Sequence, residues 1–310
     1  MGLIEAVPNV SEGRRGDVVG ALAAAVGGVP GATLLDTSSD PAHNRSVFTL
    51  VGDAAALKNA LLELYAAALA RIDLRAHSGV HPRIGAVDVT PFVPLEAAGM
   101  PACVALATEL GEAVARRFDL PVYLYERAAR TPDRQRLESI RRGGFENLAA
   151  KMMRPEWRPD FGPAAPHPTG GATAIGARRL LVAFNVNLDT GDLDVARRIA
   201  RAVRASDGGL DAVKAIGVRT ESPEVVQVSM NLVDFERTPL HEAFEAVRRE
   251  AERLGVEVRN SEVVGLVPAA ALLPAAARAL RIGGLTMRRV LDQRLPTREA
   301  SPAPQIAPET

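Results

Sequence analysis

The order of predicted strands and helices is the feature that most constrains this fold. Alternating and helical hydrophobic patterns predict a strand over 3–8, a helix from Ser11 to about 27, strands near 32–37 and 45–52, a helix over 53–72 and a strand near 84–90. A second run predicts a strand over 178–188, a helix over 193–205, strands near 212–219 and 225–235, a helix opened by a Thr238 cap and Pro239, and a strand near 256–265. Both runs have the order βαββαβ.

A βαββαβ unit is the split βαβ, or ferredoxin-like, arrangement, in which helices cover one face of a sheet and the other face stays open. We therefore predict a mixed α/β (α+β) protein with two ferredoxin-like subdomains, residues 1–177 and 178–296, whose sheets face each other. The chain has 310 residues and 47% hydrophobic content, enough for two cores. The Pro-rich segment 297–310 has the composition of a disordered tail.

The region between the two runs is predicted to hold helices near 101–117 and 134–152, the strand "PVYLY" at 121–125, and a loop or linker over 155–180 that is rich in Pro and Gly. The apolar stretch 263–277 falls short of the roughly 20 residues that a membrane span needs. We expect it to be a buried strand end that leads into a core helix.

Composition limits the partners and the compartment. Lys plus Arg and Asp plus Glu both number 37, so the chain has no broad basic field for a nucleic-acid backbone. No signal peptide is apparent at the start, and we expect no membrane partner. The single cysteine, Cys103, lies in an apolar helical pattern and is expected to be a buried thiol, which favours a cytoplasmic protein.

Two strands of the second unit alternate apolar and uncharged polar residues. Asn185 and Asn187 share one face of their strand, and Gln227, Ser229 and Asn231 share one face of theirs. A solvated face and a ligand-binding face both fit this pattern. Amides in place of the usual charged residues favour a ligand.

The segment "HSGVHPR" holds two histidines, His77 and His81, four residues apart. Histidines at this spacing share a face only on a helix, but Gly79 and Pro82 disfavour one, and no third histidine or cysteine completes a metal site. A nucleophile turn and a phosphate-binding loop are absent from the sequence. General acid/base chemistry by His81 and a structural role in the loop both remain open.

Nine ordered strings resemble the formiminotransferase (glutamate formimidoyltransferase) family from about residue 3 to 295. They are "AVPNVSEGRR" (6–15), "LLDTSSDPAHNRSVFTLVG" (34–52), "HSGVHPRIGAVDVTPF" (77–92), "PVYLYERAA" (121–129), "RRGGFENL" (141–148), "PDFGP" (159–163), "GATAIGARRLLVAFNVNL" (171–188), "VSMNLVDF" (228–235) and "EVVGLVPAAALL" (262–273).

The resemblance implies an enzyme of histidine degradation that transfers the formimino group of N-formimino-L-glutamate to N5 of tetrahydrofolate and releases L-glutamate. It also implies a cytoplasmic homodimer, no metal, and a folate tunnel lined by the two sheets. Animal members are fused to a cyclodeaminase, for which this chain is too short, so we expect the transferase alone. A metal-dependent amidohydrolase with His77 and His81 as ligands, and a non-catalytic folate-binding protein, are the competing hypotheses.

The resemblance places the catalytic histidine at His81. It implies folate binding by Gly162, Pro163, Ala164, Ala165, Pro166, His167, Pro168, Thr169, Gly170 and Gly171. Ser38 stands where animal members have an acidic residue that assists the histidine, so either Asp36 or Asp40 is expected to take that role.

Arg45 and Arg83 are the candidate partners of the substrate carboxylates. Arg45 could instead pair with Asp36 across a turn. His77 is expected to support the loop. His43 could contact ligand or only brace the backbone.

Overall fold

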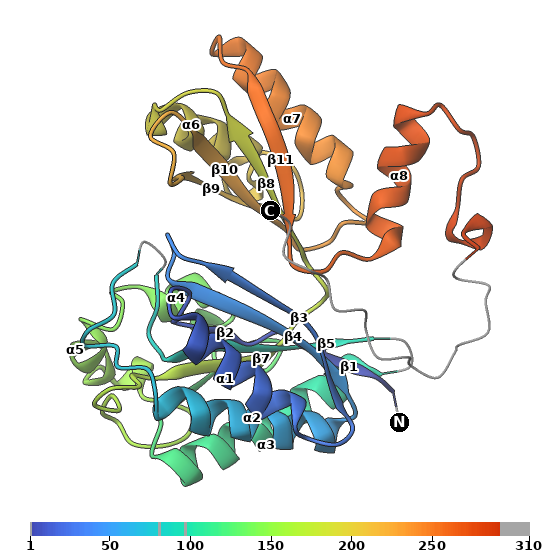
Figure 1. Cartoon of the computed structure of the whole chain (residues 1–310). Helices are drawn as coiled ribbons and strands as arrows, with labels where there is room; N and C mark the ends of the chain where they lie inside the picture. Colours follow the sequence, from blue (N-terminus) through green and yellow to red (C-terminus); the bar gives the residue numbers. More distant parts are fainter. Residues whose placement is uncertain (1, 80–81, 96–97, 292–310) are drawn as a thin grey trace.

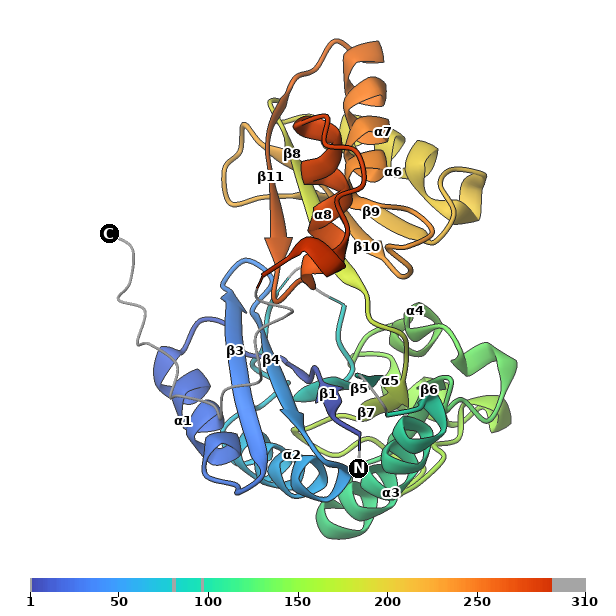
Figure 2. The ribbon, with the colours of Figure 1, turned by 90° about the vertical axis from the view of Figure 1, so that its right-hand side faces the viewer.

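The computed structural model describes residues 2–79, 82–95 and 98–291, which form a larger N-terminal unit and a smaller C-terminal one (Figure 1). Each unit is built around one sheet. Figures 1 and 2 both place the C-terminal unit on the side of the first sheet that lies away from helices α2 and α3.

The first sheet has seven strands: β1 (Ile4–Ala6), β2 (Asn9–Val10), β3 (Ala32–Asp40), β4 (Arg45–Gly52), β5 (Val87–Pro94), β6 (Val122–Glu126) and β7 (Thr173–Ala177). Strands β1 and β2 lie between β4 and β5, and β3 lies outside β4. β7 pairs in parallel with β5 on one side and β6 on the other.

One face of this sheet is covered by α1 (Gly16–Gly27), α2 (Ala54–Leu69) and α3 (Met100–Phe118). The core between them includes the fully buried Phe48, Leu64 and Phe92. The Asp53 carboxylate begins α2 by accepting a hydrogen bond from the Ala56 amide at 2.9 Å, a standard N-cap. Cys103 is buried in α3, as predicted.

Short helices cover part of the opposite face, over β5, β6 and β7. These are α4 (Leu137–Arg141) and α5 (Leu148–Met152), whose Ile140, Leu148 and Met152 pack against Val89 and Tyr123. The described residues also include four one-turn 3₁₀ helices: Pro132–Arg134, Pro155–Trp157, Ala205–Asp207 and Met287–Arg289.

The second sheet is antiparallel, with the order β11-β8-β10-β9. Its elements are β8 (Val182–Leu188), α6 (Leu193–Val203), β9 (Val213–Arg219), β10 (Val226–Leu232), α7 (Leu240–Arg253) and β11 (Val258–Val264), followed by α8 (Ala269–Ala279). Apolar residues such as Val186, Val228 and Met230 point toward α6 and α7. Lys214 lies on the other face and forms a 2.9 Å ion pair with Glu138 of α4, so this face meets the N-terminal unit.

The predicted mixed α/β class is confirmed, but several predicted elements are wrong. The 134–152 pattern is not one helix, because Gly143 and Gly144 take positive φ angles of 94° and 65° between α4 and α5. The predicted linker contains strand β7, and α1 begins only at Gly16.

The C-terminal unit also departs from the prediction in two places. Thr238 does not cap α7; its hydroxyl donates to the Asp211 carbonyl instead, and Pro239 precedes the helix without a side-chain cap. In α8 only Ala271 is buried, so this helix is not a core element. The predicted tail, 297–310, lies outside the described residues.

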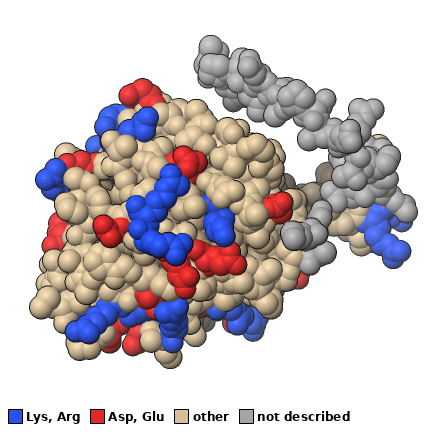
Figure 3. Space-filling model, turned by 90° about the horizontal axis from the view of Figure 1, so that it is seen from below, with Lys and Arg blue, Asp and Glu red and all other residues tan. Residues whose placement is uncertain are grey.

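The distribution of charged side chains on the surface and the hydropathy of the helices agree with the composition of the sequence. In the view from below the molecule, Lys and Arg side chains alternate with Asp and Glu, and no large single-sign patch is visible on that face (Figure 3). Within residues 2–79, 82–95 and 98–291, no helix is both long and apolar enough to cross a bilayer.

Gly171→Ala tests how tightly the main chain of the predicted folate segment is packed. Gly171 has a φ of 69°, and a Cβ added there would lie 2.0 Å from the Ile84 carbonyl oxygen. We expect a loss of about 2–5 kcal/mol in unfolding free energy from backbone strain and the clash. Gly143→Ala is the control: its φ is also positive, but the nearest atom is a side-chain carbon of Asn147 at 3.2 Å. Equal losses in denaturant unfolding would contradict this account.

Candidate active site

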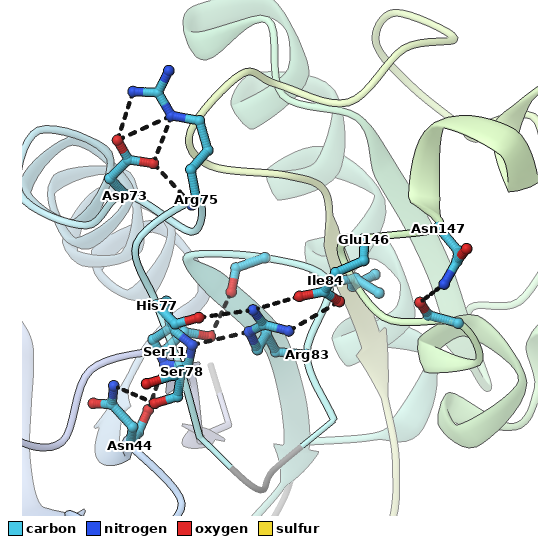
Figure 4. Close-up of polar contacts among 12 residues, drawn as sticks. Ser11, Asn44, Asp73, Arg75, His77, Ser78, Arg83, Ile84, Glu146 and Asn147 are labelled. Carbon is cyan, nitrogen blue, oxygen red and sulfur yellow. Dashed lines mark hydrogen bonds and ion pairs between the residues drawn. The ribbon is translucent and has the colours of Figure 1, made fainter.

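The loop that carries the two histidines is fastened to the β3–β4 turn through Asn44. The Asn44 amide nitrogen donates to the Ser78 carbonyl at 3.0 Å, and its side-chain oxygen accepts from the Gly13 amide at 2.9 Å. Asn44 has a positive φ of 49°, which asparagine tolerates better than most residues. A Cβ on Gly79 would lie 2.4 Å from the His43 carbonyl oxygen, so only glycine fits this approach. Figure 4 shows the Asn44–Ser78 contact.

Both ring nitrogens of His77 are engaged. Nε2 lies 3.0 Å from the Asn44 carbonyl oxygen, which can only accept, so Nε2 carries the proton. Nδ1 accepts from Arg83 Nε at 2.9 Å, which requires an unprotonated nitrogen. Burial lowers the pKa of His77, which agrees with a neutral ring. His77 in this arrangement has no lone pair to offer a metal or a proton.

Arg83 is held in the same network (Figure 4). Its guanidinium donates to the His77 carbonyl at 3.1 Å and forms an ion pair of 2.8 Å with Glu146, between α4 and α5. The arginine side chain is only 11% exposed. Arg83 therefore braces the loop on the C-terminal side of residues 80–81, while Asn44 braces it on the N-terminal side.

His81, the predicted catalytic histidine, lies outside the described residues, as does Val80.

Asp40 binds His43 rather than a partner on another strand. Its Oδ1 accepts from the His43 main-chain amide at 2.9 Å, and its Oδ2 contacts His43 Nδ1. Burial opposes ionisation of this carboxyl, but the hydrogen bonds from His43 outweigh it and hold the pKa of Asp40 below its usual value. Across the hairpin Asp40 is opposite Arg45, whereas Asp36 is opposite Thr49, so the register does not pair Asp36 with Arg45.

Arg45 is partly buried at the start of β4. Burial and the nearby Arg141 lower its pKa to about 10, although the carboxylates of Asp40 and Asp88 act in the opposite direction. Asp88 is 2% exposed and binds Arg141 through two contacts, 2.5 and 2.8 Å, to one carboxylate oxygen. Its other oxygen accepts from the Ile84 amide at 2.7 Å.

Sequence reasoning did not single out Arg141, Glu146 or Asn44. All three lie within strings that carry the family resemblance, "RRGGFENL" and "LLDTSSDPAHNRSVFTLVG". Their place in these strings was the sequence signal that could have identified them.

The polar residues of the second sheet form a connected network. Glu262 Oε1 accepts from Asn185 Nδ2 at 3.0 Å and from Gln227 Nε2 at 2.9 Å. Gln227 also donates to Asn187, which donates to Asn260 at 2.7 Å. Because Lys214 on the same face pairs with Glu138, the network lies on the side of the sheet that meets the N-terminal unit.

The predicted folate segment divides into two parts. Gly162 to Ala165 is exposed, and Gly162 lines a cavity of about 370 Å³ together with Phe161 and α3 residues Glu112, Ala115 and Arg116. His167 and Gly171 instead form a small hairpin by exchanging two main-chain hydrogen bonds. This hairpin packs on the chain just after Arg83, where the Ala86 amide donates to the Gly170 carbonyl at 3.0 Å.

His167 is held within its hairpin, where Nδ1 accepts from the Gly170 amide at 2.9 Å. Burial lowers the pKa of His167. Across the described ranges, no group of three or more His, Cys, Asp or Glu residues could hold a metal ion.

Fold and site together define a two-sheet α/β protein that presents imidazole, carboxylate and guanidinium groups on one unit and an amide network on the other. Residues 3–178 match the formiminotransferase domain, N-terminal subdomain, and residues 183–286 match the formiminotransferase domain. The chain belongs to the formiminotransferase family.

Several relatives resemble this chain over most of its length. A glutamate formimidoyltransferase of Streptococcus pyogenes serotype M1 is 46% identical over 280 residues, which cover 90% of this chain and 94% of that protein. A glutamate formimidoyltransferase of Thermoplasma acidophilum is 44% identical over 297 residues, 95% of this chain and 98% of that protein. The formimidoyltransferase-cyclodeaminase of Mus musculus is 44% identical over 281 residues, 89% of this chain but 52% of that protein.

His77→Gln tests the neutral state of His77 through pH-dependent stability. The folded pKa lies below the ordinary value of 6.5, so the unfolded chain binds the proton more readily. The wild type therefore has the full contribution of His77 above about pH 6.5 and loses it as the pH falls below that value. We expect the stability difference between wild type and His77→Gln to shrink below pH 6.5 in denaturant titrations. Parallel curves from pH 5 to 8 would refute the assignment.

Proposed function

We propose that this protein is a glutamate formimidoyltransferase, which transfers the formimino group of N-formimino-L-glutamate to N5 of tetrahydrofolate and releases L-glutamate. The observation that carries the proposal is the similarity to proteins named for this activity, at 44–46% identity over nearly the full length of both chains. Tetrahydrofolate is a co-substrate in this reaction.

The chemistry requires two proton movements. The attacking N5 of tetrahydrofolate must lose a proton as it bonds to the formimino carbon, and the glutamate nitrogen must gain one as it leaves. An imidazole between the two nitrogens can carry out both steps, typically with about 10²–10⁴-fold acceleration. The family resemblance assigns this role to His81. The network of Asn44, His77, Arg83 and Glu146 holds the described residues that precede and follow 80–81.

Substrate carboxylates are proposed to bind at Arg45 and Arg83. Arg83 donates to His77 and Glu146, and Arg45 lies in the cluster of Asp40, Asp88 and Arg141. Tetrahydrofolate is proposed to lie between the two sheets, with the amide network on one side. The segment Gly162–Gly171 retains its proposed folate role, supported only by the resemblance.

The remaining expectations are also part of this proposal. The subdomains are proposed to be 1–177 and 178–296, and the protein is proposed to act as a cytoplasmic homodimer that needs no metal.

His81→Ala tests the proposed activity directly. Protein, N-formimino-L-glutamate and tetrahydrofolate are mixed, and acid then converts 5-formimidoyltetrahydrofolate to the absorbing methenyl form. We expect product with the wild type, less with His77→Ala because the loop loses a brace, and almost none with His81→Ala. Full turnover by His81→Ala would make the catalytic assignment wrong, and absence of product with the wild type would overturn the proposed function.

Glu262→Gln tests the proposed folate surface. The pterin ring offers N–H donors, and the ionised carboxylate of Glu262 can only accept. We expect about a tenfold higher KM for tetrahydrofolate, near 1.4 kcal/mol, with kcat little changed. Glu250→Gln is the matched control, because Glu250 is on α7, on the other face of the same sheet. Equal KM values for both variants would show that folate does not use this surface.

A further inference from the structure

Three shielded arginines of the N-terminal unit differ in how fully their guanidinium groups are engaged. The side chains of Arg83, Arg134 and Arg141 are 11%, 6% and 15% exposed. All three nitrogens of Arg83 donate hydrogen bonds. In Arg134, Nη1 pairs with Asp160 and Nη2 donates to two main-chain carbonyls. In Arg141, Nε and Nη2 both bind Asp88, and no described residue binds Nη1.

The contact with Asp88 fixes the plane of the Arg141 guanidinium. Nε and Nη2 lie 2.8 and 2.5 Å from the same oxygen, Oδ2 of Asp88. Asp88 is held in turn, because it is 2% exposed and its Oδ1 accepts from the Ile84 amide at 2.7 Å. A guanidinium bound through its Nε side still has an end formed by Nη1 and the outer N–H of Nη2. Two parallel N–H groups of this kind fit a second carboxylate.

Arg141 lies on a short stretch of chain that contacts both the second sheet and the loop of the two histidines. Three residues earlier on α4, Glu138 forms its ion pair with Lys214 of β9. Residues three apart on a helix are neighbours on one face, so Arg141 is on the side of α4 that meets the second sheet. Five residues later, Glu146 pairs with Arg83, which braces that loop (Figure 4).

A second arginine near Arg141 leaves the positive charge there incompletely compensated. Burial and the charge of Arg141 lower the pKa of Arg45 to about 10, and the carboxylates of Asp40 and Asp88 oppose this shift without cancelling it. A bound anion would therefore stabilise both guanidinium groups. N-formimino-L-glutamate brings two carboxylates.

We propose that Arg141 binds one carboxylate of N-formimino-L-glutamate through its Nη1 end, in addition to Arg45 and Arg83, and thereby selects a dicarboxylate substrate. The inference deepens the proposed function and rests on it. An uncharged amide at the same position would present N–H groups to N–H groups and lose the charge-assisted contact. Tetrahydrofolate also carries carboxylates, so the test measures the two substrates separately.

The decisive experiment compares N-formimino-L-glutamate with N-formimino-L-glutamine and N-formimino-L-isoglutamine, in which the γ- or the α-carboxylate is an uncharged amide. We expect Arg141→Gln to raise KM for N-formimino-L-glutamate about 30-fold, with kcat within a factor of three and KM for tetrahydrofolate within a factor of two. For the analogue that lacks the carboxylate bound by Arg141, kcat/KM is expected to stay near the wild-type value. The preference for the diacid over that analogue then falls about 30-fold.

A double variant keeps the test independent of folding defects. Loss of Arg141 alone leaves Asp88 buried without its partner, which is strongly destabilising. Arg141→Gln combined with Asp88→Asn removes both charges and is expected to show the same loss of preference. Thermal unfolding of each variant establishes that it is folded.

Arg142→Gln is the matched control. Arg142 is the next residue in the chain, is exposed, and lines a separate cavity of about 510 Å³ together with Lys151 and Arg154. We expect its KM for all substrates to equal that of the wild type.

Four results would overturn the inference while leaving the proposed function intact. The first is an active wild type that uses both analogues as well as the diacid. The second is a folded variant at Arg141 whose kcat/KM falls equally for all three formimino substrates, which assigns Arg141 a structural role. The third is a rise in KM confined to tetrahydrofolate, and the fourth is unchanged kinetics. A wild type that forms no product from N-formimino-L-glutamate would instead overturn the proposed function, and this inference with it.

Discussion

The arrangement of the site depends on the hydrogen bonds of one asparagine. Asn44 is 7% exposed, and its side chain joins the Gly13 amide to the Ser78 carbonyl while its own carbonyl accepts from His77. Three segments distant in sequence therefore meet at the β3–β4 turn. Leaving such buried polar groups unpaired costs about 1–3 kcal/mol each, so a change at this residue would loosen all three segments at once.

The charged groups of the N-terminal unit are buried more deeply than stability alone would favour. Arg45 is partly buried beside a second arginine, and Asp88 is almost fully buried with Arg141. Desolvating charges costs several kcal/mol per ion, and replacement by apolar residues is often neutral or stabilising. Buried charges of this kind are common at functional sites, because fixed charges in a site that excludes water interact strongly with a ligand.

The two sheets contribute different chemistry. The first presents titratable and charged groups, which suit proton transfer and carboxylate binding. The second presents an uncharged amide network around one carboxylate, Glu262, which suits recognition of a heterocycle through hydrogen bonds. The Lys214–Glu138 ion pair connects the two units on these faces. This division agrees with a reaction in which one substrate is acidic and the other carries a fused ring.

The sequence by itself determined the mixed α/β class, the βαββαβ element order from β8 to β11, the alternation that separates amides from core residues, and the family. These properties are local or periodic, so they can be read without knowing which segments meet. Strand β7 was missed because a short run of small residues, Thr173–Ala177, becomes a strand only when β5 and β6 flank it. The break between α4 and α5 depends on two glycines whose φ angles the periodicity does not reveal. Only the tertiary structure decided that Asp40 binds His43, that Arg141 binds Asp88, and that both nitrogens of His77 are occupied. Each of these contacts forms only when the fold brings donor and acceptor within about 3 Å, either from segments far apart in the chain or across a turn of specific geometry.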